Sequence, residues 1–413
     1  MEPNEYFAMM SGILNQILEY IDNESDPEIE FHSLSELLIQ QEISRNKFLL
    51  KELLHLLVKI SNNYHRNSGF FSKIQAILSL FKTEILKYYS NFEIFNIFKN
   101  NKRLLLYLFK NNILTPDKTI ARIISKGKYQ TAFYPFYFYK EFKNFFDKKI
   151  FNEINQRKSS SKEEEEEEEK QEDNSFFNIN YIEKNDELFE IKREIGENDD
   201  AICIFIQKGD VKSFISFTQH KIYDLNSFVK PSIFETNPFL LYRNPTLIEY
   251  SVFHGSYEIF QYLCFGGVKL TPQLWNYAVH GSDSDLIHYL EYSEIKPRED
   301  FIKEAILESV KCHHNLLKDY LQNSLSTITN SFDDEVDMAI IKARNYSLFQ
   351  QKKLNDFHFF FSFCKYDYLS IVENLLKKEK KYHLSNTRQI ILTKKIFLSN
   401  EVFNNNLFSY DIS

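Results

Sequence analysis

The chain has 413 residues and a formal net charge of −8, with 43% hydrophobic and 26% charged residues. This length allows two or three domains with real cores, and the composition is that of a globular protein. Only 9 Gly and 9 Pro are present, which argues against a loop-rich or all-β design and favours helices. No stretch approaches the roughly 18 uninterrupted apolar residues of a membrane span.

The first ten residues, MEPNEYFAMM, are acidic and lack the basic region that opens a secretory signal. Four cysteines, Cys203, Cys264, Cys312 and Cys364, are scattered without CxxC spacing. Cysteines placed in this way are typical of reduced thiols in the cytosol. We therefore expect a soluble, cytoplasmic protein.

The N-terminal half predicts a series of amphipathic helices. Residues 35–60 place leucines and isoleucines at intervals of three and four, which gives each helix one apolar stripe. Similar stripes follow as far as residue 110. Thr115 before Pro116 predicts a further helix start, with the threonine as N-cap. We expect these helices to form an N-terminal domain over residues 1–158.

A run of seven glutamates, Glu163–Glu169, indicates a boundary in the middle of the chain. Like charges at this density repel one another and bury nothing, which predicts an acidic, largely disordered linker over residues 159–198. Residues 31–160 hold 22 Lys and Arg against 9 Asp and Glu, whereas residues 161–200 hold 5 against 17. From residue 201 onward the chain is nearly neutral, with 23 against 24.

The C-terminal half contains a phrase that returns after 27 residues. NPTLIEYSVFHGSYEIFQYL at 244–263 is followed by TPQLWNYAVHGSDSDLIHYL at 271–290. Each begins with a capping side chain before a proline, Asn244-Pro245 or Thr271-Pro272, which predicts a helix start. A short apolar helix, a polar turn and a second helix follow. One such pair cannot bury its own apolar face, so successive pairs must stack.

Weaker copies extend the repeat over residues 199–384, and we expect five or six units in all. Gly255 stands at the turn of the first phrase, Ser282 takes its place in the second, and Gly209 stands at the turn of an upstream copy. The weaker copies are residues 199–217, 301–321, 333–350 and 357–378. Residues 385–413 are expected to form a C-terminal cap or tail.

These phrases resemble ankyrin repeats. The stretch from Thr246 to Gly267 follows the family consensus, and Ser251, Ala278 and Ser309 supply small residues where that family packs helix on helix. The chain is similar to a large protist family in which a helical region of no assigned activity precedes divergent ankyrin repeats. No unit keeps the family's T-P-L-H tetrapeptide, and the repeat is shorter than the usual ~33 residues. The resemblance implies an all-α protein, with a helical N-terminal domain followed by an ankyrin-type helix-turn-helix solenoid.

In ankyrin repeats, residues just before the turn line a concave face to which partners bind. The resemblance places seven residues there: Gln207, Lys208, Phe253, His254, His280, Lys311 and Cys312. A rigid stack that presents such a stripe implies a non-catalytic protein–protein interaction module or scaffold, whose protein partner the sequence does not identify. The alternative is that these side chains are merely solvated or contact insertions of the chain itself.

The basic region 31–160 supports a second function, that of a nucleic-acid or anionic-membrane adaptor. Residues 125–149 interleave lysines with Tyr and Phe, a combination that stacks bases beside phosphate contacts. Eight basic residues extend this footprint: Lys99, Lys102, Arg103, Lys110, Lys126, Lys128, Lys148 and Lys149. Against this function, aromatic residues also build cores, and the acidic run is able to fold back and mask the surface.

Catalysis and metal binding have little support in the sequence. Cys312-His313-His314 suggests zinc, but adjacent histidines on a helix point about 100° apart, and no spaced pair completes a set of four ligands. No nucleophile elbow or glycine-rich phosphate loop is found, and Gly266-Gly267 is typical of a helix C-cap. We therefore expect no enzyme activity, no cofactor, no metal and no small-molecule substrate.

Overall fold

The computed structural model describes residues 2–23, 26–67, 69–127, 133–146, 182, 184–220, 223–293, 299–325, 332–349 and 357–381. The chain forms two compact units. Unit 1 combines residues 1–84 with 297–413, and unit 2 comprises residues 85–296. The predicted run Glu163–Glu169 and the predicted tail 385–413 lie outside the described residues.

The described part of the chain is all-α, which confirms this part of the predicted fold; it has no β-strand, only the isolated bridge between Phe228 and Thr246. The regular elements of unit 1 are α1 (Pro3–Asp22), α2 (Pro27–Gln40), η1 (Ile43–Arg45), α3 (Lys47–Asn63), α4 (Phe70–Leu80), α21 (Glu299–Lys311), α22 (Asn315–Tyr320), η4 (Leu321–Leu325), α23 (Asp333–Ala343), η6 (Tyr346–Leu348), α24 (Phe357–Lys365) and α25 (Leu369–Lys381). Helix α5 (Lys82–Tyr88) spans the division between the units. The helices of unit 2 are α6 (Asn91–Phe98), α7 (Lys102–Lys110), α8 (Lys118–Ser125), α9 (Tyr134–Tyr137), α10 (Tyr139–Phe142), α13 (Asp186–Ile195), α14 (Ala201–Gln207), α15 (Val211–His220), α16 (Pro238–Arg243), α17 (Leu247–Phe253), α18 (Tyr257–Phe265), α19 (Leu274–Gly281) and α20 (Ser284–Tyr292).

The units group the helices differently from the predicted sequence ranges. Unit 1 joins the first helices of the chain to the last three helix pairs, and unit 2 contains the earlier pairs. Within the predicted linker 159–198, residues 186–195 form α13, which buries Phe189 and Arg193. A disordered linker therefore does not extend to α13. The division into domains 1–158 and 199–384 stays a prediction.

Three predicted helix starts, those of α8, α17 and α19, are displaced by two residues. Helix α19 begins after Gln273, so Thr271 is not its N-cap. Helix α8 begins after Asp117, whose carboxylate accepts the amides of Thr119 and Ile120, so Thr115 is not its N-cap. Helix α17 begins after Thr246, which forms a capping box with Glu249. Asp and Thr each offer a side-chain oxygen to the free amides of the first turn. At α8 and α17 the cap nearer to the apolar run starts the helix.

Six helix pairs in the described residues share one kind of turn. The pairs are α14–α15, α17–α18, α19–α20, α21–α22, α23–η6 and α24–α25. The turn residue has a φ between 53° and 65° and is, in chain order, Gly209, Gly255, Ser282, His313, Arg344 or Asp367. In five pairs the next amide donates to the carbonyl five residues earlier, as Ser256 does to Ser251 at 2.9 Å. This bond is the Schellman ending of a helix, so the turn is a structural repeat.

The α19–α20 pair departs from this pattern because α17 and α19 approach closely. A Cβ at Gly281 would lie 2.8 Å from the carbonyl oxygen of Val252 and 2.9 Å from that of Phe253. Glycine is therefore required one position before the turn. Ser282 then takes the left-handed conformation, at a cost of about 1 kcal/mol, and donates its amide to Ala278.

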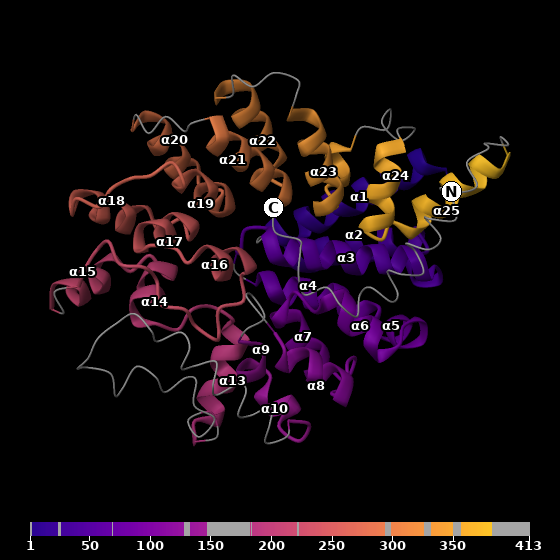
Figure 1. Ribbon diagram of the computed structural model, residues 1–413, viewed down its shortest axis with the longest axis horizontal. Helices are drawn as coiled ribbons and strands as arrows, with labels where there is room; N and C mark the ends of the chain where they lie inside the picture. Colours follow the sequence, from indigo (N-terminus) through magenta and orange to yellow (C-terminus); the bar gives the residue numbers. More distant parts are fainter. Residues whose placement is uncertain are drawn as a thin grey trace. The chain divides into compact units, whose positions relative to one another are not determined.

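Within each unit the helix pairs pack side by side. In unit 2, α14 contacts α17, α17 contacts α19, and α15 contacts α18 (Figure 1). In unit 1, α21 contacts α23, and α23 contacts α24. The small residues Ser251, Ala278 and Ser309 are fully buried, as a close helix–helix contact requires.

Candidate functional site

The predicted stripe in unit 2 is partly used by the protein itself. The Gln207 side-chain amide donates to the carbonyl of Asn198 and to the hydroxyl of Tyr250, both at 2.8 Å. Lys208, at the end of α14, is exposed. His254 is half-buried, and its ring lies 4.5 Å from that of Tyr250. Of these three predicted contacts, Lys208 is the most accessible to a partner.

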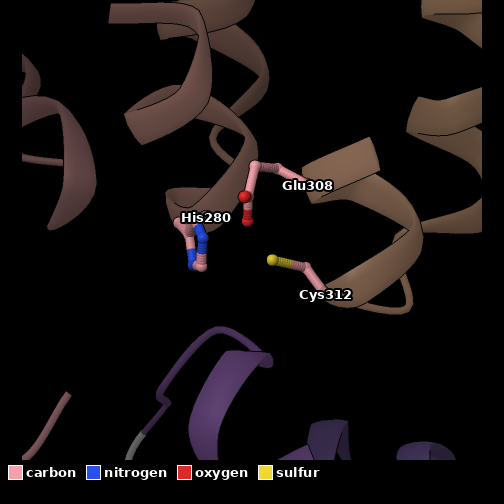
Figure 2. Close-up of side chains that lie close together, drawn as sticks. All are labelled: His280, Glu308 and Cys312. Atoms are coloured by element: carbon pink, nitrogen blue, oxygen red, sulfur yellow. The ribbon is translucent and has the colours of Figure 1, made fainter. Parts of the chain in front are cut away.

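Phe253 and His280 come together under helix α16. Their ring centroids are 5.7 Å apart, and the ring of Phe239 from α16 lies 6.0 Å from Phe253 and 3.8 Å from His280. His280 is buried on α19 (Figure 2). Both residues therefore contact another segment of the chain itself, which is the alternative predicted from the sequence.

Lys311 and Cys312 belong to unit 1, at the end of α21. The Lys311 ammonium lies 2.7 Å from the carboxylate of Glu308. Cys312 is buried about one turn after Glu308, and both side chains extend from the same side of the helix (Figure 2). Burial, together with the charge of Glu308, raises the pKa of the Cys312 thiol well above its usual value. Cys312 is thus a neutral core thiol in unit 1.

Cys264 is expected to be the most reactive thiol. It is half-buried, whereas Cys203, Cys312 and Cys364 are buried, and burial raises the pKa of Cys364 to about 12. Because the thiolate is the reacting form, iodoacetamide should modify Cys264 at least ~10-fold faster than the others. Peptide mass spectrometry measures each rate, with a denatured sample as the control. Equal modification of a buried cysteine under native conditions would contradict this burial.

Helix α3 lies against the turns of the helix pairs in unit 1. His65, just after α3, has its Nδ1 3.0 Å from Nε2 of His314 at the α21–α22 turn. Glu52 accepts a hydrogen bond from the guanidinium of Arg344 at the α23–η6 turn, and both side chains are buried. A positive φ strains a residue other than glycine. At the α23–η6 turn the strained residue is Arg344 itself, so this turn accepts strain where its side chain is needed for contact.

The third of these turns carries Asp367. Its carboxylate lies 2.5 Å from the ammonium of Lys51 and 3.4 Å from the imidazole of His55, both on α3. Burial raises the pKa of Asp367, but the hydrogen bond from His55 and the charge of Lys51 together hold it well below its usual value. Burial lowers the pKa of His55 to about 4. In unit 1 the turn side is therefore occupied by the chain's own helix.

The basic residues of the second predicted function are largely engaged inside unit 2. Lys102 is buried and its ammonium donates to the carbonyl of Ile233 at 2.7 Å. The Lys110 ammonium lies 2.8 Å from the carboxylate of Glu190 and 2.6 Å from that of Glu194. Paired and buried cations contribute little to a phosphate-binding surface.

The remaining basic residues fall into three groups. Arg103 donates to the backbone carbonyl of Ile195, and burial lowers the pKa of Lys99. Lys126 is exposed. Lys128, Lys148 and Lys149 lie outside the described residues. The acidic partners of Lys110 come from α13. The predicted masking of the basic region concerns the run Glu163–Glu169, which lies outside the described residues.

Helix α13 is anchored by a buried arginine. The Arg193 guanidinium donates to both carboxylate oxygens of Glu141, at 2.8 and 3.0 Å, and to Glu190 at 2.5 Å. It also donates to the carbonyl of Tyr137 at 2.8 Å, and the Tyr137 hydroxyl donates back to the carbonyl of Arg193 at 3.0 Å. Because the guanidinium pairs with both oxygens of one carboxylate, the contact fixes the orientation of α13 as well as its position.

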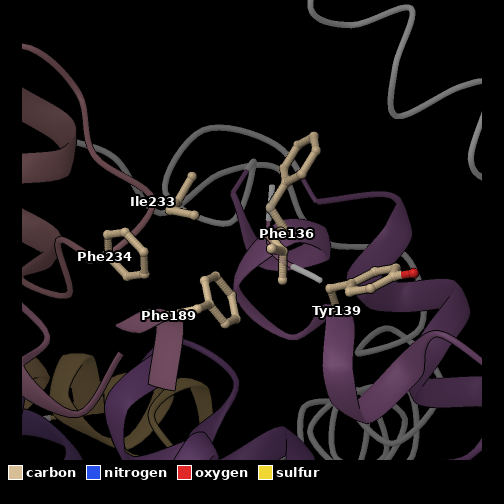
Figure 3. Packing of buried hydrophobic residues seen from close by; sticks show 6 residues of the cluster. Phe136, Tyr139, Phe189, Ile233 and Phe234 are labelled. Carbon is tan, nitrogen blue, oxygen red and sulfur yellow. The ribbon is translucent and has the colours of Figure 1, made fainter. Parts of the chain in front are cut away.

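Apolar contacts complete the anchor. Figure 3 shows Phe189 of α13 facing Phe234, and their ring centroids are 5.5 Å apart. The buried cluster consists of Phe136, Tyr139, Ile182, Phe189, Ile233 and Phe234. Burial raises the pKa of Glu190, but the hydrogen bond from Lys110 and the charge of Arg193 contribute to lowering it to about 2. The segment predicted as a charged linker thus ends in a helix that is part of the core.

A small cavity lies beside this region in unit 2. It has a volume of about 40 Å³, whereas pockets for small molecules measure about 300–1,000 Å³. Its lining includes Asn198, Glu235 and Tyr250. The space accommodates a water or an ion, and it is too small for a metabolite.

Two exposed aromatic residues are the site feature that sequence reasoning missed. Phe265 ends α18 and is 89% exposed, and Tyr292 ends α20 and is 82% exposed. They occupy equivalent positions, ten residues after the turn residues Gly255 and Ser282. The 27-residue spacing of the repeat would have paired them. Their helices are neighbours, because the Phe260 and Tyr289 rings lie 5.1 Å apart.

None of the described helices combines the length and apolar character needed to cross a bilayer. No protein-family model, curated protein or solved structure matches the chain. The resemblance to ankyrin repeats therefore stays a prediction, and function rests on the arrangement of the residues themselves.

Proposed function

We propose that the protein is a non-catalytic interaction module or scaffold, and that its helix pairs stack as divergent ankyrin-type repeats. The observation that carries this proposal is the equivalent exposure of Phe265 and Tyr292 at the ends of neighbouring second helices. Large aromatic side chains that are exposed on a rigid support are typical anchors of protein interfaces.

The location of the interface follows from the surfaces that the chain's own helices already cover. In unit 1, α3 lies against the turns, and in unit 2 helix α16 lies against Phe253 and His280. On the helix pairs of unit 2, the residues that stay accessible include Lys208, of the predicted stripe, and the aromatic pair. The partner is a protein with apolar pockets for the two rings, in line with the predicted interaction module, although the contact face differs from the predicted one.

The test compares two variants of the full-length chain in the native cell. Quantitative affinity capture is made with wild type, with Phe265→Ser/Tyr292→Ser, and with Ile29→Ser/Ile39→Ser, which removes two exposed apolar residues of α2. A hot spot contributes about 2 kcal/mol or more, so recovery of the partner should fall at least ~10-fold in the aromatic variant only. Equal recovery from all three proteins, or an equal loss in both variants, would remove the support for this interface.

A further inference from the structure

Helix α13 has a second apolar face, which is exposed within the part of the chain that the structure describes. Phe189 and Arg193 hold one face against the rest of unit 2. On the other face, Leu188, Ile191 and Ile195 are 45%, 49% and 55% exposed. With about 100° between successive residues, these three side chains fall within about 60° of one another. They form a continuous aliphatic stripe, at the spacing by which one helix packs on another.

The stripe has an acidic edge. Glu187 and Glu194 are exposed and lie along the same side of the stripe, by the same helical geometry. Glu194 also pairs with Lys110, so among the described residues Glu187 supplies the unshared charge of this edge. On the opposite side, the Lys192 ammonium is 2.7 Å from the carboxylate of Asp199 and therefore already paired. The surrounding sequence is acidic too, since residues 161–200 hold 5 Lys and Arg against 17 Asp and Glu. An occupant of this face meets aliphatic side chains and negative charge.

We infer that the exposed face of α13 is a docking site for a basic amphipathic helix of a partner protein. Such a helix supplies an aliphatic stripe for Leu188, Ile191 and Ile195 and places Lys or Arg beside the acidic edge, first of all beside Glu187. The buried anchor of α13 keeps the face preformed, so little conformational entropy is lost on binding. This site is separate from the aromatic pair of the proposed function and does not rest on it.

Charge argues against the other occupants. In an antiparallel pair with α13 of a second copy, the acidic edge would face its own equivalent, and like charges repel. An anionic membrane would be repelled by the same edge and by the acid excess of residues 161–200. A basic helix is the occupant that gains from both features of the face.

The first test uses two synthetic helices as probes. One fluorescein-labelled peptide carries a leucine face flanked by lysines, and its counterpart has glutamates in place of the lysines. We expect the full-length protein to bind the lysine peptide at least ~10-fold more tightly by fluorescence anisotropy, and added salt to weaken this binding. Equal affinity for the two peptides overturns the assignment of a basic partner.

The second test separates this face from general acidity. Leu188→Gln/Ile191→Gln/Ile195→Gln keeps residues with good helix propensity and retains the run Glu163–Glu169. We expect it to lose at least ~10-fold in affinity for the lysine peptide, with Trp275 fluorescence unchanged. The control Phe265→Ser/Tyr292→Ser should bind the peptide like wild type, which keeps the test independent of the proposed function. Unchanged affinity of the triple variant would falsify docking on α13.

Two further measurements address the other occupants. If light scattering finds a dimer of the wild type that the triple variant loses, a second copy covers the stripe and the proposal is overturned. If vesicles of anionic lipid bind wild type but not the triple variant, the face is a membrane contact and the proposal is likewise overturned. A monomer that leaves such vesicles unbound supports it.

Discussion

Arg344→Met is expected to lower the free energy of unfolding by about 3–5 kcal/mol, because it removes one partner of a buried ion pair. The Arg344 guanidinium donates to the carboxylate of Glu52, to the hydroxyl of Tyr346 at 3.3 Å and to the carbonyl of Tyr366 at 2.7 Å. Methionine fills similar volume but leaves the Glu52 carboxylate without its cation in the core of unit 1.

The unfolding free energy lost in Arg344→Met is expected to grow as pH rises. Burial raises the pKa of Glu52 from 4.5 to about 7, although the charge of Arg344 opposes this rise. A carboxyl with a higher pKa in the folded state binds its proton more tightly there, so stability falls as pH rises from about 4.5 to about 7. Without Arg344 the pKa rises further and the fall continues to higher pH. The deficit should be larger at about pH 8 than at about pH 5.

Urea denaturation followed by labelling of the buried Cys312 and Cys364 thiols reports on unit 1. The matched control is Arg45→Met, because Arg45 and Glu42 form an ion pair that is 78% and 63% exposed and contributes at most about 1 kcal/mol. Glu52→Met/Arg344→Met removes both charges and should recover most of the loss. If Arg344→Met and Arg45→Met had similar effects, the pair would not be desolvated as described.

The repeat could be predicted from the sequence because its signals are local. Gly209, Gly255 and Ser282 were placed at turns by alignment of the phrases, and all three have left-handed backbone conformations. Gly266 was expected to end a helix, and it is the C-cap of α18. Turn geometry depends on a few adjacent residues, so one sequence is sufficient to place it.

Helix starts were harder to predict because several capping residues stand close together. Asn244, Pro245 and Thr246 all suit a helix start, and the choice depended on Glu249, which completes the capping box of Thr246. That S/T-x-x-E pattern is visible in the sequence. At the start of α8, Thr115 and Pro116 also suit a helix start, but the N-cap is Asp117, two residues later.

Contacts between distant segments could not be predicted from local patterns. Glu52 and Arg344 are 292 residues apart in the chain, and no spacing rule relates α3 to the turns of later helix pairs. The accessibility of the predicted stripe depended on such contacts, because α16 supplies Phe239 beside His280. Helix α13 was missed for a different reason. Its acidic composition is typical of a solvated linker. What holds the helix in the core is the pairing of Arg193 with Glu141, a contact that no local pattern indicates.

The second large effect is expected from Arg193→Met in unit 2, again about 3–5 kcal/mol of unfolding free energy. Arg193 is 1% exposed and pairs with Glu141 and Glu190. Its removal leaves two carboxylates near the core without this cation and deletes the guanidinium hydrogen bond to the carbonyl of Tyr137. Trp275 is the chain's one tryptophan and lies buried in unit 2, so its fluorescence during urea denaturation follows this unit.

The pH dependence of this variant gives the sharper test. Glu190 has an ordinary pKa of 4.5 that the fold lowers to about 2. A carboxyl with a lowered pKa in the folded state contributes stability above about pH 4.5, and this contribution is lost as pH falls toward about 2. Without Arg193 the pKa of Glu190 is lowered less, so the deficit should be larger at about pH 7 than at about pH 3. Arg122→Met, at an exposed position of α8, should change stability by less than about 0.5 kcal/mol at either pH. A deficit for Arg193→Met that did not change with pH would mean that Arg193 acts through its packing rather than through its charge.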